Sequence, residues 1–195
     1  MQVEFGMDAF SYISIVPSII IALGLTRLLT GIGRILEKRG KVQTYWVHLL
    51  WSLNVFLYMV LNWWILIRWE PQEVWTFPLF LFLLLTPTVL FLLSVILFRE
   101  PFEDSTSFEQ TYYHDHRWFF TLASLIGPLD FIDTALKGVP HLLSQGPIYF
   151  VTIPLITVLS IIAAITNNKT YHKFFAIFFL IYISVFISIN LNTLA

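Results

Sequence analysis

Residues 112–137 read YYHDHRWFFTLASLIGPLDFIDTALK, and this stretch decides how the chain must be organised. It begins with polar and aromatic side chains, continues as an apolar run, and then places Asp130 and Asp133 where lipid-facing residues would be expected. A carboxylate at mid-membrane costs at least about 2.5 kcal/mol on insertion scales. The rest of the chain must therefore supply helices that keep these two carboxylates away from lipid.

The composition is that of a membrane protein. Hydrophobic residues make up 57% of the 195 residues and charged residues only 12%, against about 25% charged residues in soluble domains. The 19 Phe, 8 Tyr and 7 Trp residues are an aromatic excess suited to membrane interfaces. A net charge of −1 argues against nucleic-acid binding. The absence of cysteine excludes disulfides, thiolate catalysis and cysteine-bound clusters.

Six apolar stretches have lengths near the roughly 20 residues that cross a bilayer. We predict an all-α integral membrane protein, with a single transmembrane domain over residues 1–195 and a bundle of six transmembrane helices. The predicted spans cover residues 10–30, 45–68, 74–98, 117–137, 148–166 and 171–191. A kink is expected near Pro87, because proline removes a helix hydrogen bond.

Lys and Arg residues in the short loops predict the orientation of the bundle. With the N-terminus outside, the first, third and fifth loops place eight basic residues on the cytoplasmic side, whereas the other side has only Arg68 and Lys137. Both termini are therefore predicted on the non-cytoplasmic side. The first apolar stretch lacks the features of a cleaved signal peptide, so we expect it to be retained. Compactness and the charge bias favour the bacterial inner (cytoplasmic) membrane.

The fourth predicted helix carries the strongest functional signal. Asp130, Asp133 and Lys137 follow i, i+3, i+7 spacing and share one face, so Asp133 and Lys137 can pair across one turn. Asp130 has no local partner and must find one, meet water or become protonated. Gly127–Pro128 could break the helix and expose carbonyl groups beside this acid. The pattern favours a cation or proton site; alternatively, the helix ends early and leaves both acids at the outer interface.

Polar residues in the first two helices are weaker candidates. Arg27 either extends its guanidinium to the interface or binds an anion within the bundle. Asn62 either joins helices by hydrogen bonds or lines a solute path. Small and polar residues place one face of the first helix toward the bundle: Ser14, Pro17, Gly24, Arg27, Gly31 and Arg34. Tryptophans near helix ends are predicted to be interfacial anchors: Trp46, Trp51, Trp63, Trp64, Trp69 and Trp75.

Histidines gather at the predicted cytoplasmic ends of helices two, four and six. His48, His116 and His172 could converge there, as a haem or metal site requires. His114 and His116 would diverge by roughly 200° on a helix, and no multi-histidine motif occurs. We therefore predict no cofactor, and keep haem or a metal on these three histidines as the alternative.

We expect the protein to bind or pass a small solute, ion or proton through polar groups inside the bundle. The residues expected to do so are Asp130, Asp133, Lys137, Asn62 and Arg27. No catalytic residue is predicted, because nucleophile-elbow and phosphate-binding motifs are absent. One alternative is a membrane redox or metal-dependent enzyme that uses the histidines. The other is a non-catalytic assembly or sensor subunit. The expected partners are the lipid bilayer, the solute or ion, and a second copy or another membrane protein.

Overall fold

The computed structural model describes residues 9–99 and 107–190, and this part of the chain is almost entirely helical. The helices are α1 (Ala9–Glu37), α2 (Trp46–Ile65), α3 (Phe77–Leu83), α4 (Leu85–Leu97), α5 (Phe108–Leu136), α6 (Val139–Ser144), α7 (Gly146–Ile165) and α8 (Lys169–Asn190). A short 3-10 helix, η1 (Leu66–Trp69), continues α2. Within these two ranges there is no strand, only an isolated bridge between Gln43 and Ser107.

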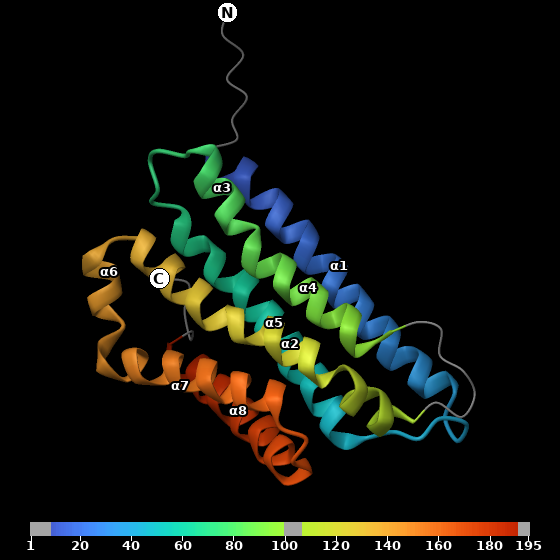
Figure 1. The fold of residues 1–195 in the computed structure, drawn as a ribbon. Helices are drawn as coiled ribbons and strands as arrows, with labels where there is room; N and C mark the ends of the chain where they lie inside the picture. Colours follow the sequence, from blue (N-terminus) through green and yellow to red (C-terminus); the bar gives the residue numbers. More distant parts are fainter. Residues whose placement is uncertain (1–8, 100–106, 191–195) are drawn as a thin grey trace, which may run out of the picture.

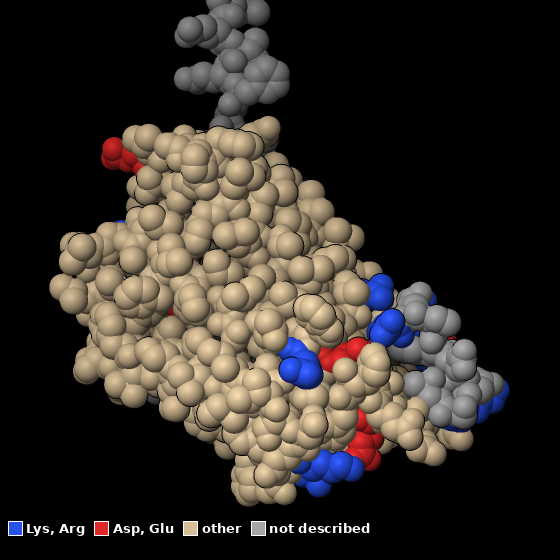
Figure 2. Space-filling model, in the orientation of Figure 1, with Lys and Arg blue, Asp and Glu red and all other residues tan. Residues whose placement is uncertain are grey.

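Six helical segments are long and apolar enough to span a membrane, with α2–η1 and α3–α4 each forming one span. Large apolar side chains are exposed along all of them. Figure 2 shows that most Lys and Arg side chains on the visible face gather near one end, next to a broad surface with almost no charge. These features point to an integral membrane protein, and they confirm the predicted set of six apolar helices.

The helices pack as two groups around a shared interior (Figure 1). On one side, α4 packs between α1 and α5, and α5 packs along α7. On the other side, α2 contacts α1, α4 and α8. We call the end formed by η1, the C-terminus of α5 and the start of α7 the Asp133 end. The opposite end, formed by the starts of α2, α5 and α8, is the His172 end.

Glycines allow three close contacts between helices. Gly24 and Gly31 on α1 face Met59 of α2 and Phe98 after α4, so the predicted inward face of the first helix is confirmed for Pro17, Gly24 and Gly31, whereas Ser14, Arg27 and Arg34 are only partly buried. Gly127 on α5 lies against Thr157 and the Ile153 carbonyl of α7. A side chain at any of these glycines would overlap its neighbour, and close approach through small residues is the usual basis of helix association in lipid.

Two features of α5 differ from the sequence prediction. The helix begins at Phe108, well before Arg117, after Ser107, whose hydroxyl accepts a hydrogen bond from the Gln110 amide. It also continues through Pro128 to Leu136, so the break suggested at Gly127–Pro128 is absent. Gly127 serves the contact with α7 instead. In the third span the helix is interrupted at Leu84, about one turn before Pro87, which agrees with the predicted kink.

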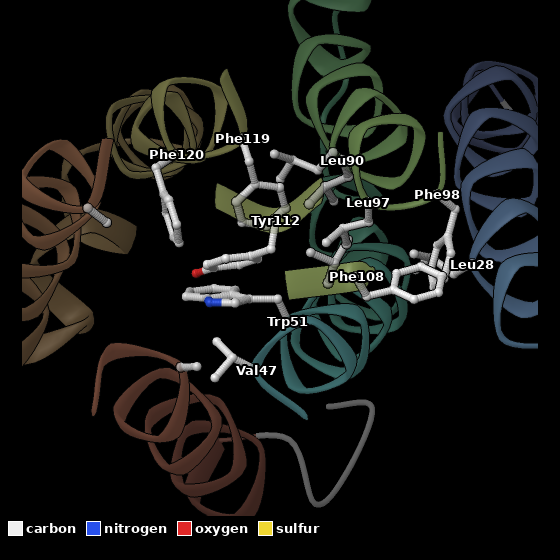
Figure 3. Close-up of a cluster of buried hydrophobic side chains, with 14 of the residues drawn as sticks. Leu28, Val47, Trp51, Leu90, Leu97, Phe98, Phe108, Tyr112, Phe119 and Phe120 are labelled. Atoms are coloured by element: carbon white, nitrogen blue, oxygen red, sulfur yellow. The ribbon is translucent and has the colours of Figure 1, made fainter. Parts of the chain in front are cut away.

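An aromatic core closes the interior toward the His172 end. The Trp51 ring is 4% exposed and meets the rings of Phe119, Phe120 and Phe175 at centroid distances of 5.5, 5.0 and 5.3 Å. Figure 3 shows Trp51 beside Tyr112, with Phe119 and Phe120 next to them. The prediction that Trp51 is an interfacial anchor is therefore wrong, because rings of α5 and α8 cover it. We call Trp51, Tyr112, Phe119, Phe120 and Phe175 the aromatic core.

The α1–α4 contact provides a test of this packing. Gly31→Ala should lower the free energy of unfolding by about 1–3 kcal/mol, because the new methyl group overlaps the Phe98 ring in a tightly packed contact. Gly33→Ala, two residues further along the same helix, is the matched control, since no atom lies within 4 Å of its added Cβ. The free energy of unfolding of both variants is measured in mixed micelles with increasing amounts of dodecyl sulfate. Equal stability of the two variants would contradict the described contact.

Candidate functional site

Asp133 is fully engaged by its neighbours at the Asp133 end. Its Oδ1 accepts a hydrogen bond from Trp69 Nε1 at 2.9 Å, and its Oδ2 accepts one from Lys137 Nζ. The Lys137 ammonium also lies 5.0 Å from the centroid of the Trp69 ring. The predicted Asp133–Lys137 pair is confirmed. Trp69 is only 2% exposed, so it orients this pair and is not an interfacial anchor.

Asp130 finds its partner on another helix. The Tyr149 hydroxyl, at the start of α7, lies 2.9 Å from Asp130 Oδ2 and 3.1 Å from Thr134 Oγ1. The hydroxyl is the donor to the carboxylate, since an ionised carboxylate can only accept. The other carboxylate oxygen, Oδ1, accepts no hydrogen bond from the residues that the structure describes. Asp130 therefore keeps an unused acceptor.

Asp130 lines an elongated cavity between α2, α5, α7 and α8, with a volume of about 90 Å³. The walls are mainly apolar and run from Trp51 toward the Asp133 end, where the charged and polar side chains are concentrated. On α2 and η1 the lining extends from Trp51 to Arg68, which corresponds to about 25 Å of helix. The aromatic core lies at the end of the cavity opposite to these charged side chains.

Asn62 lies beside the same charged groups. A second cavity, of about 30 Å³, is lined by Asn62 and Thr86 together with Asp130, Asp133 and Lys137. The structure thus brings together four of the five residues that the sequence suggested for the site. The two cavities share both carboxylates and Lys137.

Basic side chains complete the polar end of the larger cavity. Arg68 is half-buried, and its guanidinium makes no hydrogen bond or ion pair with the described part of the chain. His141 lies nearby on α6; partial burial and then the charges of Lys137 and Arg68 lower the pKa of His141 below its ordinary value. The local field is therefore set by two carboxylates, Lys137 and Arg68, with a neutral imidazole beside them.

Arg27, the fifth predicted residue, lies elsewhere. Its Nη2 donates a hydrogen bond to the Phe98 carbonyl at 2.9 Å, just beyond the C-terminus of α4. A cation near the last carbonyl groups of a helix is favourable, because these groups carry the negative end of the helix dipole. Arg27 lines a separate groove between α1 and α4. Arg27 thus takes part in the contact between α1 and α4 and lies away from Asp130.

Two histidines of the His172 end, His48 and His172, take part in hydrogen bonds between helices, whereas His116 Nδ1 bonds the Tyr113 carbonyl of its own helix. His172 uses both ring nitrogens: Nε2 donates to the Thr166 carbonyl and Nδ1 accepts from the Tyr112 hydroxyl, each at 2.9 Å. His116 lies against it, with ring centroids 5.3 Å apart. His48 is bonded to the Leu97 carbonyl at 2.7 Å. In residues 9–99 and 107–190, no group of three or more His, Asp or Glu side chains could hold a metal ion.

Sequence reasoning missed Tyr149 and Arg68 as parts of this site. Tyr149 lies near the end of an apolar span and Arg68 follows one, so both resemble ordinary interface residues. Only the packing of α7 along α5, and the turn of η1 toward α5, reveals their proximity to Asp130. Comparison with protein-family models, with curated proteins and with solved structures finds no match for this chain.

A double-mutant cycle tests the Asp133–Lys137 pair. Lys137→Met should destabilise the fold by about 1–3 kcal/mol, because it leaves a largely buried carboxylate with Trp69 as its only described partner. Adding Asp133→Asn removes that uncompensated charge, so the double variant should be more stable than Lys137→Met alone. Unfolding free energies of the four proteins in mixed micelles give the coupling. Strictly additive effects would contradict a direct interaction.

Proposed function

We propose that the protein binds a small solute, ion or proton at Asp130, within the cavity between α2, α5, α7 and α8, and passes it through the bundle. The observation that carries this proposal is Asp130, which lines the cavity and whose Oδ1 accepts no hydrogen bond from the described residues. A carboxylate in a poorly solvated interior attracts a cation or a proton strongly. Ionisable residues inside membrane helices are characteristic of such pathways.

The surrounding charges support reversible binding. Lys137 neutralises Asp133 by direct contact, and Arg68 lies near enough to influence Asp130 electrostatically. When all four are ionised their charges cancel, so one bound proton or monovalent cation changes the local charge by a single unit. The Tyr149 hydroxyl donates a hydrogen bond to the other carboxylate oxygen of Asp130, Oδ2. The site thus has a fixed geometry, and its charges balance when Asp130 is ionised and unoccupied.

Passage requires movement at the other end of the interior. The aromatic core separates the cavity from the His172 end, and its rings fill that region with edge-to-face contacts. In the orientation predicted from the loop charges, the site is reached from the non-cytoplasmic side. A transport cycle must therefore shift Trp51 and its neighbours while Asp130 is occupied.

The same closed end favours a second candidate function, that of a sensor or assembly subunit. Such a protein binds its ligand at Asp130 without passing it across the membrane. His172 gives little support to a redox or metal-dependent enzyme, because both of its ring nitrogens are already in use. Flux across a reconstituted membrane separates transport from binding alone.

Asp130→Asn should abolish proton or cation flux while leaving membrane insertion and folding intact. The amide keeps the size of the side chain but removes the negative charge that attracts the proton or cation. Flux is measured in proteoliposomes under an imposed membrane potential, with entrapped dyes for protons, sodium and potassium. Glu109→Gln is the matched control on the same helix, since Glu109 forms an exposed pair with Lys169 at the opposite end.

Flux in Asp130→Asn equal to that of the wild-type protein would refute the assignment of Asp130 as the site. Wild-type protein that conducts none of the three ions, yet retains ligand-dependent stabilisation that Asp130→Asn removes, would establish the sensor function instead. Loss of flux in Glu109→Gln as well would indicate a general defect of the bundle.

A further inference from the structure

Two opposite charges, Asp130 and Arg68, form no ion pair with the described residues at the polar end of the cavity. Asp133 and Lys137 bind each other, and Trp69 completes the coordination of Asp133. Asp130 Oδ1 accepts no hydrogen bond from the described residues, and the Arg68 guanidinium donates none to them. A ligand that satisfies this end must therefore offer both a donor cation and an acceptor anion.

We propose that the ligand is a small zwitterion with an apolar side group, namely an α-amino acid with a branched or aromatic side chain. Its ammonium group binds Asp130 Oδ1, its carboxylate binds Arg68, and its side chain extends further into the cavity. This inference rests on the proposed function, because it names the class of solute bound at the same site.

The depths of Asp130 and Arg68 along the bundle match the spacing of the two charged groups in such a molecule. Asp133 is bonded to Trp69, the residue next to Arg68, so these groups lie at nearly the same level of the bundle. Asp130 precedes Asp133 by three residues on α5, which places it about 4.5 Å deeper along the helix. The carboxylate of an amino acid then faces the Asp133 end, and its ammonium group lies about one turn further inside.

The chemistry of the two contacts favours a zwitterion over a simple ion. An ammonium group offers three donors to a carboxylate, and a guanidinium binds a carboxylate through paired hydrogen bonds. A simple cation would satisfy Asp130 but leave Arg68 unpaired and add positive charge near Lys137. A simple anion would leave Asp130 unpaired. Only a ligand that carries both charges compensates both groups without changing the net charge of the site.

The remaining wall fits an apolar side group. One turn deeper than Asp130 and Tyr149, the lining consists of Ile126 on α5 and Ile153 on α7, with Tyr182 of α8 close by. The cavity of about 90 Å³ limits the ligand to a small molecule and is too small for a lipid.

Matched ligands test the proposal on the wild-type protein in nanodiscs. Titration calorimetry with leucine and phenylalanine should show binding to the wild-type protein. Phenethylamine lacks the carboxylate and 3-phenylpropionate lacks the ammonium group, so each should bind about thirtyfold or more weakly than phenylalanine. These ligands require no substitution, so the result does not depend on the folding of a variant.

Variants then assign each charge of the ligand to its residue. Asp130→Asn should weaken phenylalanine binding at least about tenfold and leave the affinity for 3-phenylpropionate unchanged. Arg68→Gln should weaken phenylalanine similarly and leave the affinity for phenethylamine unchanged. Glu109→Gln and Arg99→Gln, at the opposite end of the bundle, are the controls and should bind like the wild-type protein.

Three results would overturn the inference. Phenethylamine that binds as tightly as phenylalanine would show that the ligand is a cation and that Arg68 is not used. No binding of amino acids to a wild-type protein whose ion flux depends on Asp130 would reject the zwitterion and leave the proposed function standing. Amino-acid binding that persists unchanged in Asp130→Asn would place the ligand elsewhere and reject the inference.

Discussion

The fold depends on the compensation of two carboxylates that the sequence places inside a membrane-spanning helix. An unpaired charge of this kind is unfavourable in lipid, so each must acquire partners as the helices associate. Asp133 draws η1 toward α5 through Trp69, and Asp130 draws α7 toward α5 through Tyr149. Gly127 permits the close approach that the second contact needs. Both carboxylates of α5 thus take part in its contacts with η1 and α7.

Both ends of the bundle hold polar groups that are fully hydrogen-bonded and others that are not; the buried His48 Nδ1 and His116 Nε2 at the His172 end have no partner among the described residues. At the His172 end, both nitrogens of His172 are bonded, and aromatic rings surround the pair that it forms with Tyr112. Such satisfied polar groups specify how helices meet. At the Asp133 end, Asp130 and Arg68 each keep bonding capacity that the described residues do not use. At the Asp133 end these unused groups belong to two charged side chains that line the same cavity.

Local spacing explains what the sequence could predict. The six apolar spans, the glycine face of α1 and the Asp133–Lys137 pair all depend on residues within one helix, where periodicity determines neighbours. Tyr149 could not be assigned to Asp130, because that contact depends on which helices are adjacent. Trp51 was expected at an interface for the same reason, since nothing local shows that α5 and α8 cover it. Arg27 lies with α4 and away from the site because α4 separates α1 from α5 and the cavity.

The two oxygens of Asp130 have separate roles, and this separation distinguishes a proton from a larger ligand. A cation or ammonium group at Oδ1 leaves the hydrogen bond from Tyr149 to Oδ2 in place, so α5 and α7 remain joined while the site is filled. Protonation acts differently, because a neutral carboxyl group is a weaker acceptor than a carboxylate. It therefore weakens the Tyr149 bond and loosens the start of α7. Binding of a solute thus preserves the helix contact that forms the cavity, whereas binding of a proton relaxes it.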